Sequence, residues 1–158
     1  MSARRIVPLL ALLALACSSS EDEKKQPPAE VFSGTVDVDI RDTAEVELTT
    51  RGDSLSATLT ISNDWGVLPK SEPISGKGRV EHFPEADVTL YTALIDIEPQ
   101  SGGPCGSEPI TLALALERSG TGGYVVGSLT PYCGKGTDSG NYARNPLRLS
   151  GQLPLPSP

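Results

Sequence analysis

Alternation of apolar and polar residues at every second position is the feature that most limits how this chain can fold. It recurs through residues 31–153, as in the stretch 35–40, where valines alternate with aspartates. A period of two places successive side chains on opposite faces of a β-strand, whereas an amphipathic helix needs a period of about 3.6. No segment after the apolar N-terminus has the helical period. The pattern therefore predicts an all-β domain.

One hairpin can be aligned from the sequence alone. A two-residue turn at 52–53 fixes the register of the segments that flank it. With this turn Leu48 faces Ala57 and Val46 faces Leu59, so apolar residues meet apolar ones. A slip of one residue would carry every apolar side chain to the other face. The sequence thus predicts a β-hairpin around residues 46–61.

The same reasoning predicts about eight strands in all, with no helix outside the N-terminal segment. Beyond the hairpin and the stretch 35–40, we expect strands at 74–83, 88–97, 110–116, 124–130 and 147–153. The apolar residues change phase between Val88 and Ile97, which predicts a bulge near Thr92. Short turns between antiparallel strands favour a small meander barrel, with a two-sheet β-sandwich as the alternative.

The N-terminus has the arrangement of a secretory signal. Arg4 and Arg5 precede an apolar run of about 11 residues, which is too short to span a bilayer and ends at Cys17. The sequence Ala16-Cys17 after this run resembles the lipobox of bacterial lipoproteins. The resemblance implies that residues 1–16 are removed and that Cys17 is diacylated on sulfur, which makes it the membrane anchor. The alternative is an ordinary secretory signal that is cleaved nearby.

Composition divides the rest of the chain. Residues 17–30 are polar and charged and are expected to be a flexible tether, 31–153 a single β-domain, and 154–158 a disordered tail. Loss of Arg4 and Arg5 with the signal leaves 11 basic against 20 acidic residues, a net charge of −9. Such a surface repels nucleic acid phosphates, so a nucleic acid partner is not expected.

The chain has three cysteines, an odd number for an exported protein. If Cys17 carries lipid, Cys105 and Cys133 remain to form a disulfide in an oxidising compartment. A metal pair or free thiols are the alternatives. The chain has one histidine and no Cys-x-x-Cys motif, which argues against zinc. We expect neither a metal nor another cofactor.

A serine hydrolase motif can be found, but its surroundings argue against an enzyme. Residues 52–55 spell Gly-Asp-Ser-Leu, as in a large hydrolase family in which the serine is the nucleophile. That chemistry needs a base beside Ser54. The single histidine, His82, is far from the C-terminal position that the family uses, and the family has an α/β fold. The hairpin turn explains the four residues, so no enzymatic activity is expected.

Three further features are candidates for binding. Asp37, Asp39, Glu45 and Glu47 are expected on one outer face, with Asp39 opposite Glu47, as a solvated acidic surface or a site for a hard cation. Trp65 is expected either to plug one end of the barrel or to act as an exposed anchor. The loop 131–145 is the best candidate for a recognition surface, through three residues: Tyr132, Tyr142 and Arg144.

These observations predict a bacterial envelope lipoprotein anchored through acylated Cys17, with the outer membrane as the expected site and its body in the periplasm or at the cell surface. Its β-domain is expected to be a non-enzymatic protein-interaction or structural module, with an envelope protein as partner. The stretches 52–61 and 124–131 are loosely similar to hairpin arms of small calycin-like barrels. Because an eight-stranded barrel can hold one small apolar ligand, the alternative function is a lipocalin-like carrier of such a ligand.

Overall fold

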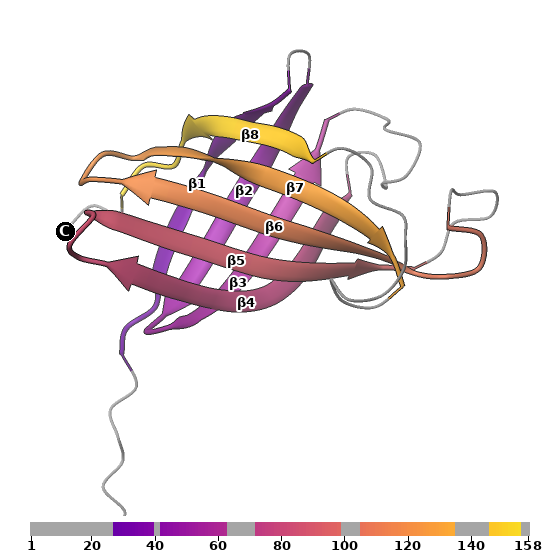
Figure 1. Ribbon diagram of the computed structural model, residues 1–158, viewed down its shortest axis with the longest axis horizontal. Coiled ribbons are helices and arrows are strands. Elements are labelled where there is room, and N and C mark those ends of the chain that lie inside the picture. Colours follow the sequence, from indigo (N-terminus) through magenta and orange to yellow (C-terminus); the bar gives the residue numbers. More distant parts are fainter. Residues whose placement is uncertain (1–26, 40–41, 63–71, 99–104, 135–145, 156–158) are drawn as a thin grey trace, which may run out of the picture.

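The computed structural model describes residues 27–39, 42–62, 72–98, 105–134 and 146–155, and these form an all-β barrel (Figure 1). Its strands are β1 (Glu30–Val38), β2 (Asp42–Arg51), β3 (Ser54–Ile61), β4 (Pro73–Phe83), β5 (Val88–Ile97), β6 (Ile110–Ser119), β7 (Tyr124–Cys133) and β8 (Leu147–Gln152). Each pairs antiparallel with the next, and β8 pairs with β1 to close the barrel. The predicted barrel is confirmed, and the sandwich alternative is wrong.

The β2–β3 hairpin has the predicted register. Leu48 lies opposite Ala57 and Val46 opposite Leu59, on either side of the two-residue turn. Gly52 in that turn has a φ of 59°, a left-handed conformation that glycine adopts at little cost. The four apolar side chains are all buried, so the face predicted from the alternation is the face that packs into the barrel.

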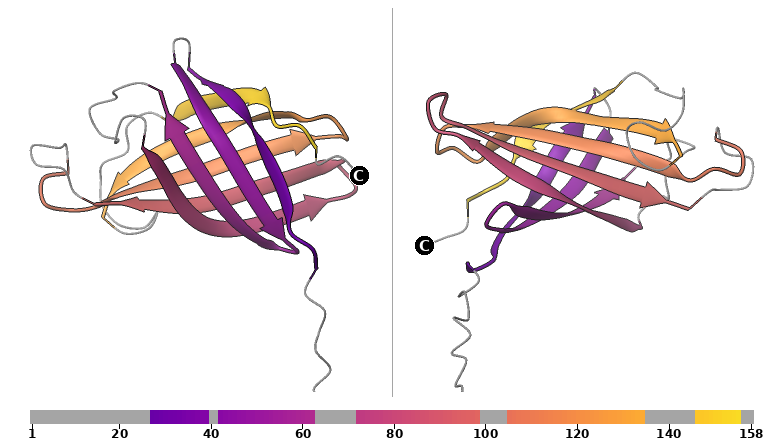
Figure 2. Two further views of the ribbon diagram at one scale, coloured as in Figure 1. Left: turned by 180° about the vertical axis from the view of Figure 1, so that it is seen from behind. Right: turned by 60° about the horizontal axis from the view of Figure 1, so that its bottom comes forward.

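The barrel is flattened into two layers whose strands cross at a steep angle (Figures 1 and 2). One layer contains β1–β3 and the other β5–β7, and β4 bends from the first to the second. A close approach of strands accompanies this bend: a Cβ atom added to Gly78 in β4 would lie 1.7 Å from the carbonyl oxygen of Thr92 in β5. Gly127 in β7 is in a similar position, because a Cβ atom added to it would lie 2.0 Å from the carbonyl oxygen of Ala115. Glycine at these inward positions allows the sheet to curve and close.

Apolar side chains from all eight strands or their ends fill the barrel as one cluster. The largest fully buried ones are Leu48, Leu59, Ile61, Ile95, Ile110, Leu112, Leu114, Leu116, Leu129, Leu153, Val36 and Val38. An eight-stranded barrel is just wide enough for its own side chains to occupy the interior. The rows of branched residues read from the sequence therefore meet in a packed lumen.

Two local predictions are wrong. β5 has no bulge near Thr92, since its pairing with β6 runs without interruption from Val88 to Ile97. Its inward row is buried and begins at Tyr91, while Val88 and Leu90 lie on the outer side. The change of phase in the sequence arises because β5 carries apolar residues on both faces.

The expected opposition of Asp39 and Glu47 is also wrong. β1 ends at Val38, and Glu47 lies opposite Ser33 instead. Asp39 turns out of the strand with a φ of 50°. Its backbone N–H donates to the carbonyl of Arg148 at 2.9 Å, and its carboxylate accepts a hydrogen bond from the backbone N–H of Arg148 at 3.1 Å. The chain turns two residues earlier than the alternation suggested, because Asp39 binds the backbone of β8.

Candidate functional site

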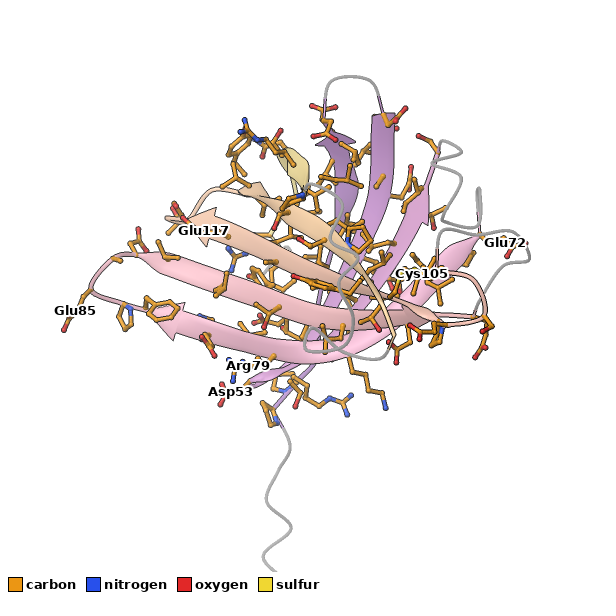
Figure 3. The ribbon with its side chains drawn as sticks, turned by 45° about the vertical axis from the view of Figure 1, so that its right-hand side comes forward. Asp53, Glu72, Arg79, Glu85, Cys105 and Glu117 are labelled. Atoms are coloured by element: carbon orange, nitrogen blue, oxygen red, sulfur yellow. A yellow bond between two sulfur atoms is a disulfide. The ribbon has the colours of Figure 1, made fainter. Side chains whose placement is uncertain are left out.

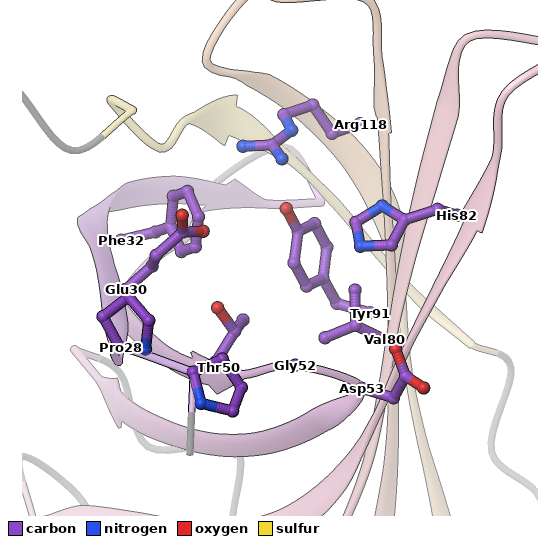
Figure 4. Close-up of a pocket in the computed structure, with 11 residues that line it drawn as sticks. Pro28, Glu30, Phe32, Thr50, Gly52, Asp53, Val80, His82, Tyr91 and Arg118 are labelled. Carbon is purple, nitrogen blue, oxygen red and sulfur yellow. The ribbon is translucent and has the colours of Figure 1, made fainter. Parts of the chain in front are cut away.

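The two ends of the barrel differ. At one end, which we name the mouth, lie the start of β1, the β2–β3 hairpin and the turns that join β4 to β5 and β6 to β7. The disulfide lies at the opposite end, so that Cys105 is separated from Glu85 and Glu117 by the length of the strands (Figure 3). A cavity of about 250 Å³ opens at the mouth (Figure 4). Its lining consists of Pro27, Pro28, Glu30, Phe32, Thr50, Gly52, Asp53, Val80, His82, Tyr91 and Arg118.

Arg118, near the end of β6, spans the apolar wall of this mouth cavity. Its guanidinium carbon lies 5.0 Å from the ring centre of Phe32 and 5.4 Å from that of Tyr91. The two rings are 6.0 Å apart and tilted by 58°. Stacking on two aromatic rings holds the flat guanidinium in one orientation. Within the described ranges, the group has no carboxylate at ion-pair distance, so its donors are available to a ligand.

Tyr91 contributes a buried ring and a polar tip to the same cavity. Burial of the ring raises the pKa of its hydroxyl above the usual value; the positive charge of Arg118 opposes this shift, and the negative charge of Glu30 adds to it. The hydroxyl is therefore neutral at physiological pH and can both donate and accept a hydrogen bond.

The raised pKa of Tyr91 predicts a late step in an alkaline titration of the four tyrosines. The folded state holds the phenol proton more tightly than the unfolded chain, whose pKa is about 10. The resulting stability is therefore complete below about pH 10 and is lost as the pH rises through the folded value. Near-ultraviolet absorbance of tyrosinate measures the titration. We expect Tyr91→Phe to remove the last step; loss of an earlier step would contradict the assignment.

The residues of the hydrolase motif do not come together as a catalytic pair. Ser54 is exposed at the start of β3, opposite Arg79. His82 is exposed on β4, and its Nδ1 lies 3.2 Å from the hydroxyl of Thr89. Among the hydrogen bonds of the described residues, none joins His82 to Ser54. His82 instead lines the mouth cavity.

The sulfur atoms of Cys105 and Cys133 lie 2.05 Å apart, as in the predicted disulfide. The bond ties the segment before β6 to the last residue of β7. Tyr132, of the proposed recognition loop, is half-buried in β7 opposite Thr111. The other predicted residues of that surface (Tyr142 and Arg144), together with Trp65 and Cys17, lie outside the described residues. Their roles stay predictions.

Two kinds of feature are absent from the described residues. No three histidine, cysteine or acidic side chains in the described ranges are grouped so that they could hold a metal ion. Nor does this part of the chain contain a helix with the length and apolar character needed to cross a membrane.

The outer surface of the barrel is strongly asymmetric. The outward rows of β1–β3 consist mainly of serine, threonine and acidic residues, with Val31 on β1 as an exposed apolar exception (49%). The outward rows of β4–β7 carry a set that we name the apolar outer face: Phe83, Val88, Leu90, Leu94, Ala113, Ala115, Tyr124 and Val126. Four of these are large and well exposed: Phe83 (46%), Leu94 (42%), Tyr124 (51%) and Val126 (42%). In the sequence, this face is visible in β5, where apolar residues change from the outward row (Val88 and Leu90) to the inward row that begins at Tyr91.

A shallow groove of about 570 Å³ crosses the apolar outer face. Leu94 and the small side chains of Thr92, Ala113 and Ala115 line it, and the cationic residues Lys77 and Arg79 run along one side. Arg79 is paired with Glu81, with 2.8 Å between Nε and the carboxylate, and both groups are solvent-accessible.

Comparisons with protein-family models, with curated proteins and with solved structures match this chain to none of them, so its function has to be inferred from its own residues.

Proposed function

We propose that this protein is a lipid-anchored bacterial envelope lipoprotein whose barrel is a non-enzymatic protein-interaction module. The observation that carries the proposal is the apolar outer face. The barrel closes and fills its interior without these side chains, yet Phe83, Leu94 and Val126 remain in water. Large exposed apolar residues gathered on one side of a domain mark interaction surfaces. Glu117 lies between Leu90 and Val126 on this face, so the proposed surface is apolar with charged residues among its members. The polar outward rows of β1–β3 are the contrast within the same molecule.

The proposed anchor restricts where a partner can be. Thirteen positions separate Cys17 from Glu30, the first residue of β1. A fully extended chain covers at most about 3.6 Å per residue, so the mouth stays within about 45 Å of the bilayer. The partner is therefore a membrane protein or another component of the envelope close to the membrane surface. Its contact surface should combine apolar side chains with carboxylates that face Lys77 and Arg79.

The carrier alternative has less support. Lipocalin-like carriers need an interior volume for the ligand, whereas here branched side chains from every strand occupy the lumen. The mouth cavity, at about 250 Å³, is smaller than the roughly 300–1,000 Å³ typical of sites for drug-sized ligands. A whole apolar ligand does not fit in this cavity, although a small polar group does.

Mass spectrometry of protein purified from its own membranes tests the anchor. In the denatured sample we expect a chain that begins at Cys17 and carries acyl groups, with two hydrogens missing from Cys105 and Cys133. An unacylated N-terminus beyond residue 17 would overturn the anchor. In the native sample, a small apolar adduct that disappears on denaturation would favour the carrier instead.

Site-specific photo-crosslinking in intact cells tests the interaction surface. A photoreactive residue at Leu94, on the apolar outer face, should give a discrete protein adduct, and one at Ser56, exposed on β3, is the matched control. The additional change Val126→Glu places a charge on this face and should reduce the Leu94 adduct about tenfold or more, since unpaired charges are poorly tolerated at an interface core. Equal adducts from both positions, or adducts with lipid alone, would contradict a protein partner.

A further inference from the structure

We infer that the mouth cavity is a binding site for a small zwitterionic group, in which Arg118 binds the acidic end and Glu30 the ammonium end. This inference is separate from the proposed partner on the apolar outer face, because it rests on a different part of the barrel. It depends on two opposite charges that line one cavity and form no ion pair with each other among the described residues.

The cationic wall of the site is already organised. Arg118 lies against the rings of Phe32 and Tyr91, at 5.0 and 5.4 Å from their centres, and these contacts hold its guanidinium in place. Its planar donors match the geometry of a carboxylate or phosphate, which they can bind with two parallel hydrogen bonds. The neutral hydroxyl of Tyr91 lies on the same side and can donate a third.

The anionic wall comes from a distant part of the sequence. Glu30 is the first residue of β1 and lines the cavity, and in Figure 4 it lies on the side where Pro28 and Phe32 are drawn. Both charged residues line the cavity together with Tyr91, so the two opposite charges share one site. A ligand with an acidic group and an ammonium a few bonds apart would neutralise both walls at once.

Size and net charge narrow the ligand class. A volume of about 250 Å³ holds about eight water molecules at roughly 30 Å³ each, which is the scale of a head group or a free amino acid. The mature chain carries a net charge of −9, so a simple anion would be repelled at a distance. A zwitterion has no net charge. Pro27 and Pro28 form part of the wall, so the chain that leads to Cys17 leaves from the rim of the cavity.

Titration calorimetry on the mature protein, in detergent micelles, tests the inference with two zwitterions. Glycerophosphoethanolamine represents a lipid head group, and L-alanine represents a free amino acid. Ethanolamine and acetate are the single-charge controls. We expect one zwitterion to bind at least about tenfold more tightly than either control, and the zwitterion that binds identifies the source. Failure of both to bind the folded barrel at millimolar concentration would overturn the inference, as would acetate binding equally well.

Variants separate the site from a general effect on the fold. Arg118→Gln and Glu30→Gln should each weaken the zwitterion about tenfold or more, because each removes charge-assisted hydrogen bonds. Arg148→Gln, an exposed position on β8, should not change the affinity. Thermal melting of each variant checks that the barrel is intact. The Val126→Glu variant should bind the zwitterion normally, so a missing protein partner and a missing ligand give different results. Tighter binding by Glu30→Gln would assign the site to an anion instead.

Discussion

Replacing Gly78 with alanine is expected to destabilise the barrel by about 3 kcal/mol or more, at the upper end of the cost of overpacking a core. The new Cβ would lie 1.7 Å from the carbonyl oxygen of Thr92 and 2.6 Å from the Cα of Ala93. Both are backbone atoms of β5, so no side-chain rotation relieves the clash and the two strands have to separate. Domains of this size have a total stability of only about 5–15 kcal/mol. Urea unfolding followed by near-ultraviolet circular dichroism measures the effect.

The matched control for Gly78 is Gly122, in the turn between β6 and β7. Its added Cβ would lie 4.0 Å from the nearest atom, the backbone nitrogen of Tyr124. Gly122→Ala is therefore expected to change the free energy of unfolding by no more than about 0.5 kcal/mol. If both substitutions had the same small effect, the close approach of β4 to β5 would not be a requirement for closing the barrel.

Loss of the Cys105–Cys133 bond is the second large expected effect. The two residues are 28 positions apart, and a cross-link of that span restricts the unfolded chain by about 3–4 kcal/mol on the chain-entropy view. The double substitution by serine should lower the free energy of unfolding by that amount. Reductant should lower the stability of the unsubstituted protein equally and leave the double variant unchanged. An unfolding midpoint that does not respond to reductant would exclude a stabilising disulfide.

Pairings between strands that are adjacent in the chain could be predicted from the sequence. The β2–β3 hairpin follows from its turn at 52–53 and from two apolar rows that agree in only one register. Closure of the barrel was predicted, but the register of its closing seam could not be, because no local pattern records that Val38 pairs with Leu149. Alternation shows which residues share a face, but it cannot tell the inner face from the outer where both are apolar. In β5 this ambiguity produced a bulge that does not exist.

The mouth cavity was beyond prediction for a related reason. Arg118, Tyr91 and Glu30 come from β6, β5 and β1, and no spacing in the sequence connects them. Arg118 follows Glu117 at the end of a strand, where a charged residue ordinarily faces solvent. Only the closed barrel brings it over Phe32. The disulfide, in contrast, could be predicted, since cysteine parity is a property of the whole chain and needs no geometry.

The seam between β1 and β8 has a consequence for the order in which the protein is made. Asp39 and Arg148, which bind each other beside the seam, are 109 residues apart, and the seam itself consists of three residue pairs. Ribosomes synthesise β1 before β8, and an exported chain also delivers β1 to the envelope before β8, so the edge of β1 that pairs with β8 stays free until nearly the whole chain has emerged. Contacts of such long range slow folding, and an open strand edge is a template for aggregation. A chain interrupted before β8 would expose β1 and β7 together, which makes incomplete translation products a particular burden on chaperones and proteases.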